Sequence, residues 1–162
     1  MNKFYGAENY IQNIIEEYSD MLLRISYAYM KNFSDAEDIT QEVFLKLLDK
    51  HPIFESSEQE KAWLIRVAIN SSKDRLKSSW FKRTTPLEGD FTDNTKEENE
   101  IIEAVLSLPL KYRSIILLFY YEDYSISQIS GIVKLKESTV GSQLSRARKL
   151  LKSKLKEDFL YE

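Results

Sequence analysis

Carboxylates recur at three- and four-residue spacings in the segment SDAEDITQEVFLKLLDK, residues 34–50. On a helix these spacings gather side chains on one face. The outer face so formed carries Asp35, Asp38, Glu42 and Asp49, with Gln41 near its edge. Like charges three and four residues apart destabilise an isolated helix by a few tenths of a kcal/mol per pair. A cationic partner would relieve this repulsion.

The acidic face allows three interpretations. Catalysis or metal binding needs further ligands or a cleft that perturbs the carboxylates, yet no second ligand cluster follows, and the only histidine, His51, lies beside Pro52. The chain has no cysteine and no glycine-rich nucleotide loop. We therefore expect no catalytic residue, no metal and no cofactor. A solvated face and a docking face for a basic partner both remain open.

A basic face with one aromatic residue follows in the segment 60–83, which has seven Lys/Arg and two Asp/Glu. The helical period places these residues together: Trp63, Arg66, Asn70, Lys73 and Lys77. Cations with an aromatic ring suit phosphate contacts combined with base stacking, which is how separated strands are held. The alternative for Trp63 is packing against the first helix, because large aromatic side chains are usually buried.

A third candidate surface lies near the C-terminus, where residues 134–156 hold eight Lys/Arg and one Asp/Glu. The capping-box sequence SISQ at 125–128 starts a short helix to 133, KLKE forms a turn, and a longer helix runs from about 138 to 156. One face of the longer helix suits a major groove: Thr139, Ser142, Gln143, Arg146 and Lys149. Arg148 and Lys152 lie off this face and suit phosphates. The alternative is an ordinary amphipathic surface helix.

The elements that position these surfaces are all predicted to be helices, because apolar residues recur at three and four, with only four glycines and three prolines. Five further helices are expected, at residues 8–31, 34–50, 57–83, 99–107 and 109–121. The capping-box sequences SDAE and SEQE begin the helices at 34–50 and 57–83. The Pro-, Gly- and acid-containing segment 84–98 predicts a flexible acidic linker between two small helical domains, 1–83 and 99–162. With no bilayer-spanning stretch and no signal peptide, we expect a cytoplasmic protein.

These segments resemble the extracytoplasmic-function sigma factors, a group of the bacterial sigma-70 family. YSISQISGIVKLKESTVGSQLSRARKLLKSKL and the preceding LSLPLKYRSIILLFYYEDYS are similar to sigma region 4. DAEDITQEVFLKLL is similar to region 2.2, and AWLIRVAINSSKDRLK to regions 2.3 and 2.4. Departures from the family pattern are Lys77, Lys134, Ser138, Gly141 and Gln143.

The resemblance implies an alternative sigma factor that is not an enzyme. Its region 2 helix would dock on the clamp helices of the largest catalytic subunit of core RNA polymerase through Asp38, Gln41 and Glu42. The first domain would bind the −10 promoter element, with the loop 51–59 capturing an unstacked base, and the second would bind the −35 element. A membrane-linked anti-sigma factor would hold the protein inactive. Two alternatives remain: a helix-turn-helix regulator that binds duplex DNA without polymerase, and a helical protein-interaction adaptor.

Overall fold

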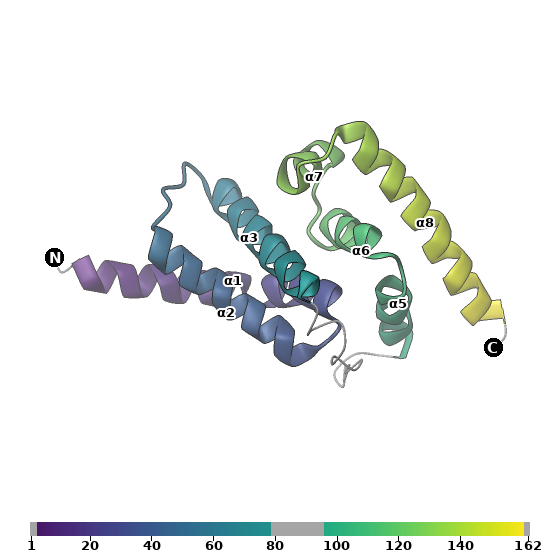
Figure 1. The fold of residues 1–162 in the computed structure, drawn as a ribbon, viewed down its shortest axis with the longest axis horizontal. Helices are drawn as coiled ribbons and strands as arrows, with labels where there is room; N and C mark the ends of the chain where they lie inside the picture. The colour runs from purple at the N-terminus through teal and green to yellow at the C-terminus, as the bar shows by residue number, and fades with distance from the viewer. Residues whose placement is uncertain (1–2, 79–95, 161–162) are drawn as a thin grey trace. The chain divides into compact units, whose positions relative to one another are not determined.

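The chain is described here by a computed structural model, which covers residues 3–78 and 96–160, with side chains described for 9–78 and 100–155. It divides into two compact units, Met1–Pro86 and Leu87–Glu162. Every regular element within the described ranges is helical, which confirms the predicted all-α class (Figure 1). None of the helices in these ranges combines the length and the apolar character needed to cross a membrane.

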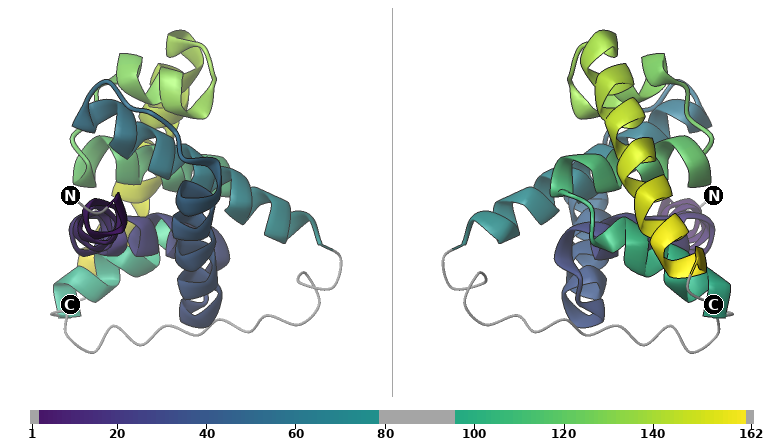
Figure 2. Two further views of the ribbon diagram at one scale, coloured as in Figure 1. Left: turned by 90° about the vertical axis from the view of Figure 1, so that its left-hand side faces the viewer. Right: turned by 90° about the vertical axis from the view of Figure 1, so that its right-hand side faces the viewer.

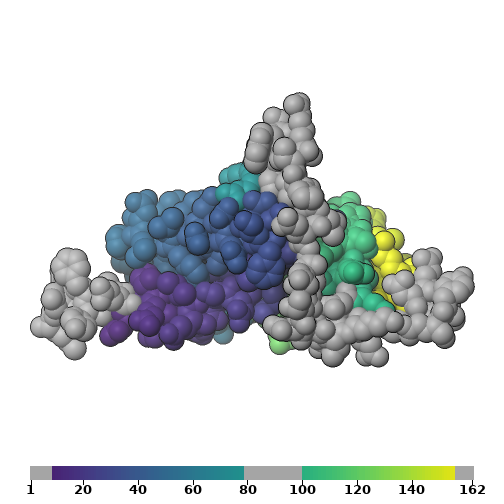
Figure 3. Space-filling model, turned by 90° about the horizontal axis from the view of Figure 1, so that it is seen from below, coloured from purple at the N-terminus to yellow at the C-terminus, as the bar shows by residue number. Residues whose placement is uncertain are grey.

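The first unit is built from three helices that pack against one another: α1 (Lys3–Met30), α2 (Phe33–Lys50) and α3 (Ser57–Lys77). Figure 3 shows α1 and α2 side by side on one surface of this unit. The spacing of apolar residues in α2 predicts an inner face of Ala36, Ile39, Val43 and Leu47, and all four are buried. In α1 the same spacing predicts a core face that includes Ile14, Tyr18, Leu22, Ile25 and Tyr29, which are buried as well. Two further residues of that face are less enclosed, since Ile11 is half-buried and Ile15 is 39% exposed.

Both capping assignments in this unit were wrong by one or two residues. Helix α2 is capped by Asn32, whose side chain accepts a hydrogen bond from the backbone N–H of Asp35, so the helix begins before Ser34. Helix α3 is capped by Ser56, whose hydroxyl accepts from the N–H of Gln59. Asn and Ser satisfy the exposed N–H groups of a first turn equally well, so neighbouring candidates compete. Helix α3 ends at Lys77, not at residue 83, and 79–83 lie outside the described residues.

The second unit contains α5 (Lys96–Leu106), α6 (Leu110–Ile116), a π-helical turn η1 (Leu117–Tyr121), α7 (Ile126–Val133) and α8 (Glu137–Leu160). Helix α8 packs against α5, α6 and α7 along its length (Figures 1 and 2). The segment predicted as one helix over 109–121 therefore ends in a π-helical turn. Residues 96–98, expected in the linker, belong to α5, and the rest of the predicted linker, 84–95, lies outside the described residues.

The helix-turn-helix forms as predicted. Ser125 and Gln128 make the reciprocal hydrogen bonds of a capping box at the start of α7. The helix ends at Lys134, which has a left-handed backbone with φ of 58° and donates its N–H to the carbonyl of Ser130. The core of the unit is closed by residues of α7 and α8 that are at most 4% exposed: Ile129, Ile132, Val140, Leu144 and Ala147.

Candidate functional site

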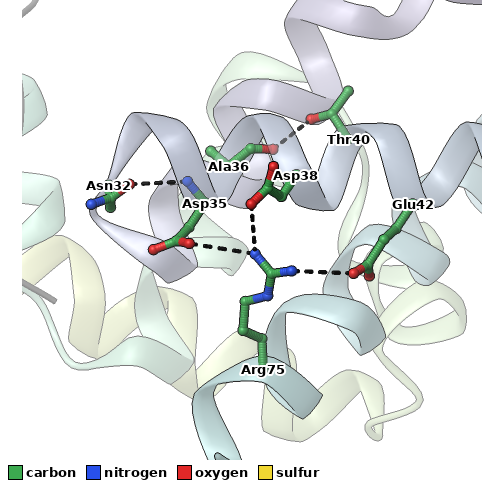
Figure 4. Close-up of polar contacts among 7 residues, drawn as sticks. All are labelled: Asn32, Asp35, Ala36, Asp38, Thr40, Glu42 and Arg75. Carbon is green, nitrogen blue, oxygen red and sulfur yellow. Dashed lines mark hydrogen bonds and ion pairs between the residues drawn. The ribbon is translucent and has the colours of Figure 1, made fainter. Parts of the chain in front are cut away.

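The outer face of α2 meets a cation of its own chain. Arg75 of α3 reaches across to three carboxylates of α2 (Figure 4). Its Nη1 lies 3.4 Å from Asp35 Oδ1 and 3.4 Å from Asp38 Oδ2, and its Nη2 lies 3.3 Å from Glu42 Oε1. The repulsion expected along this face is therefore relieved in part by the protein itself. One positive charge against three negative charges still leaves the cluster net acidic.

These ion pairs are individually weak. Charge-assisted N–H···O bonds are typically about 2.7–2.9 Å long, whereas the three contacts of Arg75 are 3.3–3.4 Å and none is bidentate. The side chain of Asp38 is 54% exposed and that of Glu42 is 43% exposed, so water screens both. Ion pairs of this kind contribute at most about 1 kcal/mol each. The acidic face therefore remains accessible to a partner.

Apolar side chains extend this surface beyond the carboxylates. Gln41 is exposed, and Leu45 and Leu48, four and seven residues further along α2, are 63% and 43% exposed. Asp49 is also exposed. A helix that presents two exposed leucines beside carboxylates offers a mixed apolar and acidic surface, which is typical of protein interfaces. The spacing pattern predicted the carboxylates on this face, but it did not predict that the two leucines are exposed beside them.

The basic face of α3 is divided by burial. Asn70, Lys73 and Lys77 are exposed, whereas Trp63 and Arg66 are half-buried. The ring of Trp63 contacts Phe54 edge-on, with centroids 5.8 Å apart. Trp63 thereby anchors the segment before α3, which was not foreseen. The sequence holds one indication of this contact, because Phe54 is the only Phe, Tyr or Trp in the segment 51–59.

The segment between α2 and α3 carries a fully exposed apolar side chain. Its first residue, His51, has a left-handed backbone and ends α2. Ile53 is 95% exposed, while the next residue, Phe54, is held by Trp63. The other end is fixed by Gln59, whose side-chain oxygen accepts from the N–H of Glu55. This segment is therefore tied down at Phe54 and Glu55 and presents Ile53 to solvent.

Helix α8 presents the predicted polar face. Ser142, Arg146 and Lys149 are exposed, and Thr139 is half-buried. Gln143 is also half-buried, and its Oε1 is enclosed without a hydrogen-bond partner. A bidentate contact with adenine needs both ends of the amide, so Gln143 would have to turn outward to read a base.

Arg148 and Lys152 differ in their surroundings although both are exposed. The Nε of Arg148 donates to the hydroxyl of Tyr120 in the π-helical turn. Its guanidinium lies 5.0 Å from the centroid of the Phe119 ring and 5.5 Å from that of Tyr120. Arg148 is thus held on the aromatic side chains of η1, a structural contact that sequence reasoning missed.

The described residues do not form a recognisable metal-binding site. Among the side chains that the structure describes, those of residues 9–78 and 100–155, no three His, Cys, Asp or Glu are grouped in a way that could hold a metal ion. The carboxylates of α2 that converge do so on the guanidinium of Arg75. What the two units offer is binding surfaces: an acidic face on α2, a basic face on α3, and a helix-turn-helix.

Comparison with known proteins identifies the family to which the chain is similar. Residues 14–82 match the family Sigma-70 region 2, and residues 98–151 match Sigma-70, region 4. The sigma factor SigV of Bacillus subtilis is 29% identical, with 98% of this chain and 99% of SigV covered. The extracytoplasmic-function (ECF) sigma factor SigW of the same organism is 26% identical, with 94% of this chain and 92% of SigW covered.

Solved structures show the same fold. The sigma factor RpoE of Bartonella quintana, crystallised with the anti-sigma factor NepR, is 20% identical with a TM-score of 0.77, covering 90% of this chain and 96% of RpoE. CnrH, solved with the cytosolic domain of CnrY, is 18% identical with a TM-score of 0.69, covering 93% of this chain and 90% of CnrH.

Two regions of one family thus match most of the chain in order, and they define a sigma-70-type protein. The chain belongs to the extracytoplasmic-function group of the sigma-70 family and is a sigma factor of RNA polymerase. This outcome confirms the family predicted from the sequence.

Proposed function

We propose that the chain binds core RNA polymerase through α2 and directs it to promoters with both of its units, the first at the −10 element and the second at the −35 element. The observation that carries this proposal is the match to regions 2 and 4 in one chain, each with the binding surface that its part of the function requires. The chain makes and breaks no bond in this role. Catalysis belongs to the polymerase.

Polymerase docking is assigned to Asp38, Gln41 and Glu42 of α2. All three lie on the outer face of the helix, and their exposure leaves them accessible to the clamp helices of the largest catalytic subunit. Leu45 and Leu48 extend the same surface and would add apolar contact area. A buried apolar centre beside charged groups combines affinity with orientation.

Contact with the −10 element is assigned to the basic face of α3. Lys73, Lys77 and Asn70 are exposed and can reach the strand directly. Trp63 and Arg66 are half-buried, and the contact of Trp63 with Phe54 would present the neighbouring segment in a fixed position. Taking a base out of the stack costs a few kcal/mol, which contacts to the exposed strand must offset.

Contact with the −35 element is assigned to α8. Ser142 and Arg146 are exposed in the first half of this helix, where a recognition helix contacts base edges. Thr139 and Gln143 lie in the same half, and exposed Lys149 follows directly after it. Arg148 and Lys152 would contact phosphates, Arg148 from its place on Tyr120. Phosphate contacts fix the register of the protein on the duplex but carry no base preference.

An anti-sigma factor is the proposed regulator. The structure of RpoE with NepR holds a sigma factor together with an anti-sigma factor, and CnrH was solved with the cytosolic domain of a partner protein, CnrY. By analogy, we place this chain in the cytoplasm, held inactive by a membrane-linked anti-sigma factor.

The decisive experiment is transcription in vitro with purified core polymerase and a library of promoter sequences. Transcripts that require the chain support the sigma mechanism, and their start sites give the −10 and −35 sequences. Tight binding to duplex DNA without polymerase association would instead indicate a helix-turn-helix regulator. If neither polymerase nor DNA is bound, the remaining explanation is a protein-interaction adaptor.

A further inference from the structure

We infer that Arg75 is an internal competitor for polymerase, because it occupies the carboxylates of α2 that the docking subunit has to contact. The inference deepens the proposed function and rests on it. It starts from a geometric fact: the carboxylates of Asp38 and Glu42, whose side chains are 54% and 43% exposed, are also those that the guanidinium of Arg75 contacts (Figure 4).

Arg75 lies on the side of α3 that faces α2, away from the lysines of the basic face. Lys73 and Lys77 lie two residues before and after it, which places them about 200° away around the helix. Arg75 has a side-chain exposure of 27%, while Lys73 and Lys77 are exposed. The guanidinium of Arg75 therefore pairs with the carboxylates of α2 in the same unit and does not belong to the basic face of α3.

The contacts are of a kind that a partner can replace. One guanidinium is shared among three carboxylates at 3.3–3.4 Å, so no carboxylate receives the two parallel bonds of a strong arginine pair. Partly exposed pairs of this strength contribute at most about 1 kcal/mol each. A cation of the polymerase that approaches with better geometry can displace Arg75 at small cost.

Displacement has a consequence for affinity. While Arg75 is in place, the three carboxylates and the guanidinium carry a net charge of about −2, and their oxygens are partly satisfied. A basic partner then gains less from each contact than it would gain from unoccupied carboxylates. Arg75 therefore lowers the affinity of the free sigma factor for cationic surfaces, and it limits binding to partners that present cations in the arrangement the carboxylates require.

The test is a set of binding measurements between the full chain and purified core polymerase at low and high ionic strength. We expect Arg75→Gln to bind about threefold to tenfold more tightly than the unmodified chain at low salt. The gain should shrink at high salt, because it is Coulombic. Arg75→Lys, which keeps the charge but lacks the fork that spans three acceptors, should fall between the two.

Two controls separate this competition from other effects. Lys50→Gln removes the same charge from an exposed position at the end of α2 and should leave the affinity unchanged. When Asp38→Asn and Glu42→Gln are already present, Arg75→Gln should give a clearly smaller gain, because only Asp35 of the three carboxylates is then left for Arg75 to occupy. Circular dichroism establishes that each variant is folded.

The outcomes distinguish this inference from the proposed function. If the unmodified chain does not bind core polymerase, the proposed function fails and this inference fails with it. If the unmodified chain binds but Arg75→Gln binds equally or less tightly, only the competition is refuted. The same conclusion holds if the gain from Arg75→Gln is undiminished when the carboxylates of Asp38 and Glu42 are absent.

Discussion

Arg148 of α8 donates a hydrogen bond to the hydroxyl of Tyr120 in the π-helical turn and lies over the neighbouring Phe119 ring, 5.0 Å from its centroid. The pair joins the last turn of the α6 and η1 segment to the helix that carries the proposed base-reading residues. Arg148 therefore has a structural role in the absence of DNA, in addition to the phosphate contact proposed for it.

Replacing Arg148 by alanine should lower the free energy of unfolding of the second unit by about 1 kcal/mol, since a cation–π contact and a hydrogen bond are lost together. Hydrogen exchange of α8 amides in the full chain measures this loss. Lys152→Ala, an exposed cation one turn further along, should change it by less than about 0.5 kcal/mol. Equal effects of the two changes would show that the contacts with Tyr120 and Phe119 contribute nothing to stability.

Neutralising the docking carboxylates should weaken binding of core polymerase without unfolding the first unit. Asp38→Asn with Glu42→Gln should reduce the affinity at least about tenfold, because two charges complementary to a basic partner are removed. Glu37→Gln removes one exposed charge from the same turn of α2 outside the docking set and is the matched control. Normal binding by the double variant would refute the docking assignment.

A glycine at position 134 should stabilise the helix-turn-helix. Lys134 has φ of 58° and ψ of 46° at the C-terminal end of α7, a left-handed conformation in which a Cβ atom is crowded. Lys134→Gly should raise the free energy of unfolding of the second unit by up to about 1 kcal/mol. Lys152→Gly, at an exposed position inside α8 without a positive φ, is the control and should lose stability, because glycine is unfavourable within a helix. A loss at both positions would contradict the prediction.

Features that depend on neighbouring residues could be predicted from the sequence. The all-helical class and the capping box at Ser125 follow from local spacing, and the structure confirms both within the residues that it describes. The turn after α7 was also predictable, since KLKE interrupts the apolar period. Information of this kind is contained in neighbouring residues, because a helix repeats every 3.6 residues.

The contacts that the sequence did not predict join residues far apart in the chain. Arg75 meets Asp35 across 40 positions, and Arg148 meets Tyr120 across 28. The helical period says which side of α3 Arg75 occupies, but not that this side faces α2. Ile15 is 39% exposed although its spacing groups it with the core of α1, since a spacing pattern does not say which residues a neighbouring helix covers.

Alanine at position 141 should stabilise α8. A Cβ atom added to Gly141 would meet nothing within 4 Å, so no neighbour has to move. Glycine within a helix costs up to about 1 kcal/mol relative to alanine, and Gly141→Ala should recover about 0.5–1 kcal/mol, seen as slower hydrogen exchange at the start of α8. Gly131→Ala, equally open in α7, should behave alike. A destabilised Gly141→Ala variant would show that the glycine is required by the fold.

Alkaline pH should destabilise the first unit through its tyrosines. Burial raises the pKa of Tyr10, Tyr18 and Tyr27 above the ordinary value of 10.0. Glu60 raises the pKa of Tyr10 further, because its carboxylate accepts a hydrogen bond from the Tyr10 hydroxyl and carries a negative charge. Above about pH 10 the unfolded chain loses phenolic protons that the folded unit keeps, so the folded state binds more protons and stability falls as pH rises. The stabilisation is complete below pH 10 and is lost as the pH passes through the raised values.

Urea unfolding at pH values from about 8 to about 11, followed by circular dichroism and phenolate absorbance, measures this dependence. Tyr10→Phe removes one raised group while keeping the ring, so its stability should fall less steeply above pH 10 than that of the unmodified chain. Tyr121→Phe, in the second unit and 49% exposed, is the matched control and should leave the slope for the first unit unchanged. If the unmodified chain and Tyr10→Phe lose stability with identical slopes, the phenol of Tyr10 titrates alike in the folded and unfolded states, and its hydrogen bond to Glu60 does not hold the proton.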